Sequence, residues 1–527
     1  MQKVNLNLLP PPSNVIRTTS ITIWQWGWAG FLLDHDILRK LNYDEDRIKD
    51  YILDKGEGVY FIIIHDIKND RYIFLTDRFS CKKIFFYQEN DELYFSDFLY
   101  KFKTHLNKNF DLDWASIGLY LMYGYVPSND TLYKGVKSLK PFTYYEYKDN
   151  QIRENQYYDI EFKEEKISYV DAVSGTFRLL EQSFLSLTQH HKHFLIPLSG
   201  GRDSRFLLAL AIKHYSKDQI ITFTFGQKGS LEYEIGKGLG KKFGLKSILF
   251  PFDDQTYFNA FVYSGTKFKN GLINHSIDAP SKMYEEILGN NKDILVISGY
   301  IGDVVLSWSH GKKLIKFNKE LLYPETNYFS FEVIKECFSD DVNELISRLE
   351  RIVCHLYDEN GNIVPEKWFY FCRAPHYVNT CLFSEEKLYP FALPFIEKNF
   401  YKWITKIPVE YKKKNDFYKD ILHVEDFIYS FFRYPLKNYQ GVGYDGNGIS
   451  HILLKTKFII KAMINRVKRS QNFINFEKAY PEKFLSDQIN SIHQFLFLKP
   501  LVNKLNRLSF NQKCLLLSLK LNLEYFS

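Results

Sequence analysis

The chain has 527 residues and a mass of 62.6 kDa, which at roughly 150 residues per domain predicts about three domains and excludes a single small module. Its 45% hydrophobic and 25% charged residues match ordinary globular usage and exclude a disordered or fibrous chain. The formal net charge is +7, but residues 450–527 hold 13 basic and 4 acidic residues, which leaves 56 basic and 58 acidic in the rest. This near-neutral remainder disfavours a nucleic-acid-binding protein.

The cysteine pattern and the lengths of the apolar runs indicate the cellular compartment. Six cysteines are scattered without a CxxC pair, which favours a reducing compartment over a disulfide scaffold or a zinc site. The longest apolar runs, such as Val59–Ile64, are far shorter than the roughly 18 residues that span a bilayer. The amino terminus also lacks the pattern of a signal peptide. We therefore expect a cytoplasmic protein that does not act in a membrane.

The first region reads as β-structure in its central part, where short apolar or alternating runs are separated by polar turns. The predicted strands are Val59–Ile64, Arg71–Thr76, Ile84–Tyr87 and Leu93–Phe95. A polar and charged stretch between Asn150 and Lys166 predicts a domain boundary.

Beyond this boundary, strands alternate with helices. The predicted elements are a helix over 167–189, a strand over 193–198, a helix over 205–215 and strands over 220–225 and 294–297. Each strand ends in a small-residue loop, which predicts a parallel sheet with ligands at the carboxyl ends of its strands. Helical patterns dominate after about residue 315, with amphipathic pieces near 449–467 and 495–523 in the basic tail.

The loop after the strand at 193–198 carries the clearest chemical signal. It reads Ser199-Gly200-Gly201-Arg202-Asp203-Ser204 and leads directly into a helix. Glycines let backbone N–H groups approach an anion, the two serine hydroxyls can donate to it, and the helix N-terminus adds a favourable dipole. The spacing differs from the Gly-x-x-x-x-Gly-Lys-Ser/Thr phosphate loop, and Asp203 suits Mg²⁺ instead. A helix-capping turn with a solvated Asp203 is the simpler alternative.

This loop resembles the Ser-Gly-Gly-x-Asp-Ser signature of the ATP-pyrophosphatase loop family, and further segments resemble the asparagine synthetase family in the same order. These segments are Asp77-Arg78-Phe79-Ser80, Gly124-Tyr125-Val126-Pro127, Thr131–Val136 and Ser298-Gly299-Tyr300-Ile301-Gly302-Asp303. The resemblance implies an α/β protein of three parts. Residues 1–165 would form a β-rich, class II amidotransferase-like sandwich, residues 166–450 a parallel-sheet ATP-pyrophosphatase synthetase domain, and residues 451–527 a helical tail.

The resemblance also implies a reaction and roles for single residues. A carboxylate would attack the α-phosphate of ATP to give an acyl-adenylate and pyrophosphate, and an amine or ammonia would then displace AMP. The residues that would bind the nucleotide are Ser199, Gly200, Gly201, Asp203, Ser204, Gly226, Ser298 and Gly299. Asp203 and Asp303 would bind Mg²⁺, and Lys437 would be a catalytic lysine that stabilises developing negative charge.

Two departures from the family pattern bear on the nitrogen source. The family hydrolyses glutamine with a cysteine that methionine removal exposes, whereas this chain has Gln2 there and its first cysteine is Cys81. We therefore expect a retained scaffold without glutaminase activity. The second departure is Tyr300, which together with Ile301 replaces the family's Glu and Gly. A tyrosine here is similar to β-lactam synthetase, where a Tyr–Glu dyad helps to deprotonate an amine of the substrate, and it makes Tyr300 a second catalytic candidate.

Several functions remain open at this point. Within the ligase class they are ammonia-dependent asparagine synthesis, ring closure of the β-lactam synthetase or lasso-peptide macrocyclase type, and amidation of sugar acids. A non-catalytic nucleotide-binding scaffold and a tRNA-modifying enzyme with RNA on the basic tail are the alternatives from other classes. The expected partners are a small-molecule or peptide carboxylate, an amine or ammonia, and a protein that delivers the substrate.

Overall fold

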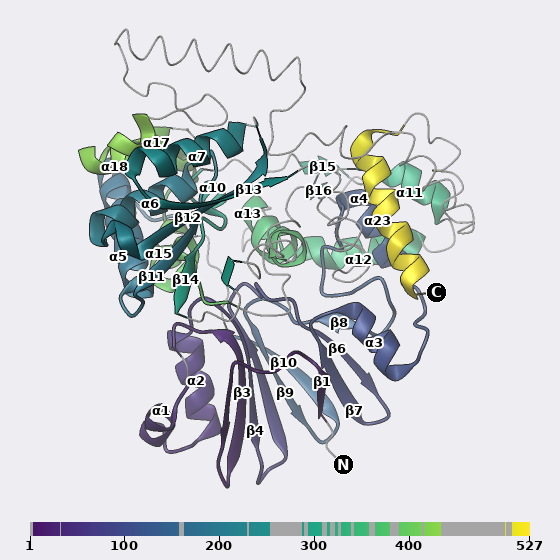
Figure 1. Ribbon diagram of the computed structural model, residues 1–527. Helices are drawn as coiled ribbons and strands as arrows, with labels where there is room; N and C mark the ends of the chain where they lie inside the picture. The colour runs from purple at the N-terminus through teal and green to yellow at the C-terminus, as the bar shows by residue number, and fades with distance from the viewer. Residues whose placement is uncertain are drawn as a thin grey trace.

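Figure 1 shows the chain as a computed structural model. The structure describes residues 4–31, 33–157, 163–228, 231–252, 287–288, 293–307, 314–316, 322–324, 328–338, 342–357, 364–379, 389–413, 416–433, 501 and 508–526. No helix among these residues is both long and apolar enough to cross a lipid bilayer. The helical piece predicted near 449–467 lies outside the described residues.

Two packed sheets form the amino-terminal domain in the lower part of Figure 1. Its elements are β1 (Val4–Leu8), β2 (Asn14–Arg17), β3 (Ile21–Trp28), α1 (His35–Lys40), α2 (Glu45–Lys55), β4 (Val59–Asp66), β5 (Arg71–Thr76), β6 (Phe85–Glu89), β7 (Glu92–Ser96), α3 (Leu99–Leu106), α4 (Trp114–Tyr123), β8 (Lys137–Ser138), β9 (Thr143–Lys148) and β10 (Gln151–Gln156). The sheets have the orders β1-β7-β6-β8 and β10-β9-β5-β4-β3-β2. The four strands predicted in this region are confirmed within two residues, as β4 to β7.

Strand alternation explains the layers of this domain. One apolar cluster takes Phe61 and Phe74 from the larger sheet and Phe86 and Phe95 from the smaller one, so it fills the space between the sheets. The opposite face of the larger sheet packs against α1 and α2 through a second cluster, which includes Ile62 of β4. The predicted β-rich sandwich is therefore confirmed, with helices on its outer face.

A parallel sheet forms the second domain. Its elements are α5 (Tyr169–Thr188), β11 (His193–Pro197), α6 (Asp203–His214), β12 (Ile220–Gln227), α7 (Leu231–Phe243), β13 (Lys246–Phe252), β14 (Ile294–Ile297), α10 (Gly302–Leu306), β17 (Phe391–Ala392), α15 (Lys398–Ile404), α16 (Val409–Lys413), α17 (Asp416–His423) and α18 (Asp426–Ser430). The sheet order is β13-β12-β11-β14-β17 and every pairing is parallel. Helices lie on both faces, so Phe194, Leu195 and Ile196 of β11 are fully buried. The predicted parallel sheet is confirmed.

A group of helices lies beside both domains on the right of Figure 1. It contains α11 (Phe331–Cys337), α12 (Val342–Cys354), the π-helix η2 (Trp368–Val378) and α23 (Phe510–Phe526), and a short hairpin of β15 (Leu314–Lys316) and β16 (Leu322–Pro324) lies near it. Helix α4 of the first domain is buried from Ala115 to Tyr123, because α11 and α12 pack against it. The Tyr120 hydroxyl also contacts the Leu515 carbonyl of α23, 395 residues away in sequence. The tail thus contributes to the packing of the first domain.

The turn after β5, Asp77–Cys81, is buried between the two domains. The Asp77 carboxylate accepts hydrogen bonds from the backbone N–H groups of Cys81 at 2.9 Å and Phe79 at 3.2 Å. The Phe79 ring packs edge-on against Tyr401 of α15, with 5.2 Å between the ring centroids. Burial raises the pKa of Asp77 to about 6, although these backbone donors oppose the shift.

Two polar contacts accompany this turn across the interface. Glu57 binds the Arg78 guanidinium and accepts the backbone N–H of Lys398 at 3.2 Å. The Lys83 amine lies 2.8 Å from Nδ1 of His376, in η2, and burial lowers the pKa of Lys83 to about 7. Both contacts join residues more than 290 positions apart, so they form only when the two domains pack together.

The Asp77 carboxyl predicts a specific dependence of stability on pH. Its ordinary pKa is near 4, so between pH 4 and pH 6 the unfolded chain binds fewer protons at this site than the folded chain. The free energy of unfolding should therefore fall as the pH rises through this window, by up to about 3 kcal/mol from this one group. In Asp77→Asn this contribution is absent, so the stability difference between wild type and variant, measured by urea denaturation at pH 4 to 7, should change by this amount.

The matched control for this prediction is Asp54→Asn. Asp54 is exposed, and hydrogen bonds from Lys398 and Lys55 lower its pKa to about 2, so its titration lies below the window. The stability difference for this variant should be constant between pH 5 and pH 7. A constant difference for Asp77→Asn as well would show that the buried carboxyl does not titrate as stated.

Candidate active site

The order of strands in the parallel sheet defines one crevice. β11 is central, the chain next adds β12 and β13 on one side, and it then adds β14 and β17 on the other. The connections after β11 and after β14 therefore leave neighbouring parallel strands in different directions. Ligands bind at such a switch point in open α/β sheets, outside the carboxyl ends of the strands. The two loops here are Ser199–Asp203 and Ser298–Gly302, the two segments that the sequence singled out.

The first loop is held by its own serines. The Ser199 and Ser204 hydroxyl oxygens are 3.1 Å apart, and the Ser199 backbone N–H donates to Ser204 Oγ at 3.2 Å. The Gly201 N–H donates to Ser199 Oγ at 3.1 Å. Helix α6 begins at Asp203, so these groups gather at the N-terminus of a buried twelve-residue helix. Backbone N–H groups, hydroxyls and a helix terminus thus lie together here, and anion binding by them stays a prediction.

The second loop meets the first through glycine. A Cβ atom on Gly302 would lie 2.8 Å from Cγ of Asp203, and one on Gly299 would lie 3.0 Å from Cβ of Asp203 and 3.1 Å from the Ser204 backbone nitrogen. The Ser298 N–H donates to the Ala392 carbonyl of β17 at 3.1 Å, which fixes the start of the loop. Only residues without a side chain at 299 and 302 let the two loops approach this closely.

Asp203 has a partner that the sequence did not indicate. The Tyr418 hydroxyl, from α17, donates to Oδ1 of Asp203 at 2.6 Å, and the Arg202 guanidinium lies 4.6 Å above the Tyr418 ring. Burial raises the pKa of Tyr418 well above its ordinary range, and the charges of Asp203 and Asp303 act in the same direction. Both carboxylates therefore lie within electrostatic reach of the Tyr418 hydroxyl, which comes from α17.

This pair of carboxylates suits Mg²⁺. Asp203 and Asp303 provide hard oxygen ligands from the ends of neighbouring strands, and Mg²⁺ usually takes one or two carboxylates together with phosphate oxygens. Among the described residues, no group of three or more His, Cys, Asp and Glu is gathered as a metal cage. Two carboxylates are the number that Mg²⁺ usually takes from a protein when phosphate oxygens complete its shell, so Asp203 and Asp303 would suit a cation shared with a nucleotide.

Two other predicted residues have different outcomes. Gly226 lies in β12 at a φ of 143°, a backbone conformation that residues with side chains rarely adopt, and it belongs to the same carboxyl edge of the sheet. Lys437 lies outside the described residues, as does the glycine loop at 441–443 that follows it. The catalytic role of Lys437 stays a prediction.

Tyr300 is turned away from the first loop. Its hydroxyl donates to Oδ1 of Asn379, and its side chain is almost fully buried, with 3% exposure. The pKa of Tyr300 is raised well above its ordinary range, mainly by burial and next by Cys81 and Asp77 of the amino-terminal domain. The role of Tyr300 in a catalytic dyad stays a prediction.

Cys81 is buried where the amino-terminal domain meets Tyr300 of the second domain. It is fully inaccessible, and burial, followed by the Asp77 charge, raises the pKa of its thiol well above the ordinary range. Such a thiol is a weak nucleophile, because the thiolate is the reactive form. The structure therefore supports the prediction that Cys81 does not take the place of a glutaminase nucleophile.

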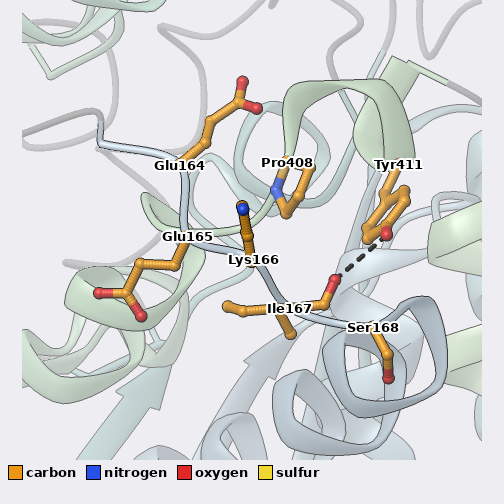
Figure 2. Close-up of a pocket in the computed structure, with 7 residues that line it drawn as sticks. All are labelled: Glu164, Glu165, Lys166, Ile167, Ser168, Pro408 and Tyr411. Carbon is orange, nitrogen blue, oxygen red and sulfur yellow. Dashed lines mark hydrogen bonds between the residues drawn. The ribbon is translucent and has the colours of Figure 1, made fainter.

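An open pocket of about 580 Å³ lies elsewhere, at the connection between the domains. Figure 2 shows the segment Glu164–Ser168 facing Pro408 and Tyr411, with the Tyr411 hydroxyl donating to the Ile167 carbonyl at 3.1 Å. None of the residues predicted to bind ATP or Mg²⁺ lines this pocket. It is the surface hollow of the domain connection rather than part of the crevice.

Comparison with known families agrees with the two-domain architecture. Residues 46–158 match the glutamine amidotransferase domain, and residues 193–284 match the queuosine biosynthesis protein QueC. The second match begins at β11 and includes the Ser199–Ser204 loop. The two matches thus cover the sandwich from α2 to β10 and the first half of the parallel-sheet domain.

Single relatives give the same picture. The chain is 23% identical to asparagine synthetase [glutamine-hydrolyzing] 1 of Bacillus subtilis over 217 residues, 40% of this chain and 33% of that protein. It is 39% identical to 7-cyano-7-deazaguanine synthase of Wolinella succinogenes over 61 residues, 12% of this chain and 26% of that protein. The chain thus spans about a quarter to a third of the length of the curated relatives it matches.

A solved structure of glutamine phosphoribosylpyrophosphate amidotransferase from B. subtilis covers 55% of this chain and 58% of its own, at 9% identity and a TM-score of 0.19, too low to support an argument. The family matches are the stronger finding, because each falls on one of the two domains described above. The chain is thus similar to a glutamine amidotransferase domain over residues 46–158, to QueC over residues 193–284, and to part of an asparagine synthetase.

Proposed function

We propose that this chain is an ATP-dependent, AMP-forming amide ligase that joins a carboxylate to an amine or to ammonia. The observation that carries the proposal is the meeting of the Ser199–Asp203 and Ser298–Gly302 loops at the switch point of the parallel sheet, with Asp203 and Asp303 together there. The asparagine synthetase and QueC-like matches support ATP use at this place.

The reaction would proceed in two displacements. A carboxylate oxygen of the substrate attacks the α-phosphorus of ATP, the bond from that phosphorus to the bridging oxygen breaks, and pyrophosphate leaves. The amine nitrogen then attacks the carbonyl carbon of the acyl-adenylate, the bond to AMP breaks, and the nitrogen loses a proton. The protein would have to bind a highly charged leaving group and to hold two reactants in one orientation.

The residues of the first loop suit the leaving group. The N–H groups and hydroxyls of Ser199–Ser204 at the start of α6 would bind pyrophosphate oxygens. Asp203 and Asp303 would hold Mg²⁺, which, when bound, offsets the negative charge on the phosphates. The Tyr418 hydrogen bond keeps one oxygen of Asp203 in place. Lys437 would stabilise charge that develops during the displacements.

The nitrogen source distinguishes two forms of this function. The matched amidotransferase segment contains one cysteine, Cys81, and its burial and raised pKa argue against glutamine hydrolysis by that thiol. The nitrogen would then be free ammonia or an amine, and an amine on the substrate itself would give ring closure as the second candidate. Multiple-turnover release of AMP that requires added ammonium favours the first form, whereas AMP release with the carboxylate substrate alone favours the second.

Asp203→Ala should abolish the reaction without unfolding the protein. The expected loss of ATP- and substrate-dependent pyrophosphate release is about 100-fold or more, because the variant removes a metal ligand at the leaving group. The assay is pyrophosphate release across a panel of carboxylates and amines. Asp171→Ala is the matched control, since Asp171 lies in the first turn of α5 as Asp203 does in α6. Equal activity in both variants would contradict the site assignment.

Lys437→Met should separate binding from chemistry. If Lys437 acts on developing charge, turnover should fall by about 100-fold while the affinity for ATP changes by less than about threefold. Equilibrium binding of ATP and the rate of pyrophosphate release measure the two quantities. Lys217→Met, at an exposed lysine, is the control. A variant that loses ATP affinity and turnover in parallel would place Lys437 among the binding residues instead.

Gly302→Ala should impair the same site, because its added methyl group would clash with Asp203. Its Cβ would lie 2.8 Å from Cγ of Asp203 and 2.9 Å from Phe395, so the two loops must separate. We expect pyrophosphate release to fall by at least about tenfold. Gly244→Ala is the control, because the φ of 66° at Gly244 strains the backbone of that variant in the loop before β13, while no atom lies within 4 Å of the added Cβ. Retained activity in Gly302→Ala would show that the close approach is not required.

A further inference from the structure

The Ser298–Gly302 loop is tied to the amino-terminal domain by consecutive buried hydrogen bonds. The Tyr300 hydroxyl donates to Oδ1 of Asn379, and Nδ2 of Asn379 donates to the carbonyls of Phe79 at 2.8 Å and Ser80 at 3.2 Å. Asn379 is fully buried. The Cys81 thiol also interacts with the Tyr300 hydroxyl. These contacts lead from the loop of the synthetase domain directly to the Asp77–Cys81 turn of the other domain.

The backbone beside Tyr300 is strained. Ile301 has a φ of 49°, in the left-handed region that β-branched residues rarely occupy, and its side chain is 6% exposed. Such a conformation persists only where the surroundings impose it. On one side Tyr300 is anchored to Asn379, and on the other Gly302 lies against Asp203 and Phe395. Asp303 follows immediately, in the first turn of α10.

We propose that Tyr300 and Asn379 are positioning residues that hold the Ile301 turn in its left-handed form and so fix Asp303 for the divalent cation. The inference rests on the proposed function, in which Asp303 is a metal ligand. The amino-terminal domain then sets the cation affinity of the ATP site, because the Asn379 side chain takes its orientation from the Phe79 and Ser80 carbonyls. Without the anchor, the turn relaxes toward a negative φ at Ile301 and carries Asp303 out of place.

The test uses the full chain with the non-hydrolysable analogue α,β-methylene-ATP and Mn²⁺ as a paramagnetic probe. Tyr300→Phe removes only the hydroxyl and should weaken Mn²⁺ binding by about tenfold, as loss of an outer-shell contact does at metal sites. The matched control is Tyr125→Phe, because the Tyr125 hydroxyl is equally buried at the interface and accepts from Trp368 Nε1 at 3.1 Å, without contact to the loop. Unchanged Mn²⁺ affinity in Tyr300→Phe overturns the inference.

A rescue variant separates positioning from general stabilisation. Glycine adopts a positive φ without strain, so adding Ile301→Gly to Tyr300→Phe should restore most of the Mn²⁺ affinity. If Tyr300 only contributed packing and stability, the double variant would bind Mn²⁺ no better than Tyr300→Phe, since it loses a further buried side chain. That result overturns the inference, and it is readable even where thermal unfolding shows that both variants are less stable.

A third variant distinguishes failure of the inference from failure of the proposed function. Asp303→Asn should weaken Mn²⁺ binding, and adding Tyr300→Phe to it should have no further effect, because Tyr300 acts through Asp303. An additional tenfold loss in the double variant overturns the positioning role and leaves the metal site intact. Unchanged Mn²⁺ affinity in Asp303→Asn overturns the metal assignment itself, and the inference with it.

Discussion

The close approach of two loops at the carboxyl edge of the parallel sheet is the constraint on which the candidate site depends. β11 and β14 are parallel neighbours, so their ends deliver the first and second loop side by side. Glycines at 299 and 302 then remove the side chains that would keep the loops apart. As a result, Asp203 contacts the second loop. The charges of Asp203 and Asp303 both raise the pKa of Tyr418, which lies on a separate helix.

This geometry gives the amino-terminal domain a structural role beside the parallel sheet. The domain's matched segment retains the buried Asp77–Cys81 turn, and that turn contacts Asn379, Tyr401 and, through Asn379, Tyr300. An enzyme that dispensed with glutamine hydrolysis would still need this wall of its synthetase site.

Much of the architecture could be predicted because it depends on local pattern. The apolar run at β4, the alternation at β5 and the strand–loop–helix order around Ser199 are visible in consecutive residues, and the structure confirms them. β3 was not predicted: six of its eight residues, Ile21–Trp28, are buried, including Gln25, so it lacks a simple two-residue alternation. The packing of helices around α4 could not be predicted from the sequence either, because these helices are distant from α4 along the chain.

The candidate site likewise contains residues that the sequence indicates and residues that only the fold brings together. Ser199, Asp203 and Asp303 follow strands and can be found from spacing, but Tyr418 reaches Asp203 from 215 residues away. The direction of the Tyr300 side chain depends on domain packing, which spacing does not encode. The positive φ of Ile301 has a partial signal in the sequence, since the related loops carry glycine where this chain has isoleucine.

The packing of α4 has a consequence for synthesis of the chain on the ribosome. Its apolar surface is covered partly by α23, and the contact between Tyr120 and Leu515 spans 395 residues. At about 5–20 residues per second, α4 leaves the ribosome roughly 20 to 80 s before the helix that completes its cover. During that interval a nascent chain exposes one of its most apolar helices. Synthesis of this protein is thus a period in which α4 is vulnerable to aggregation, until α23 has been made.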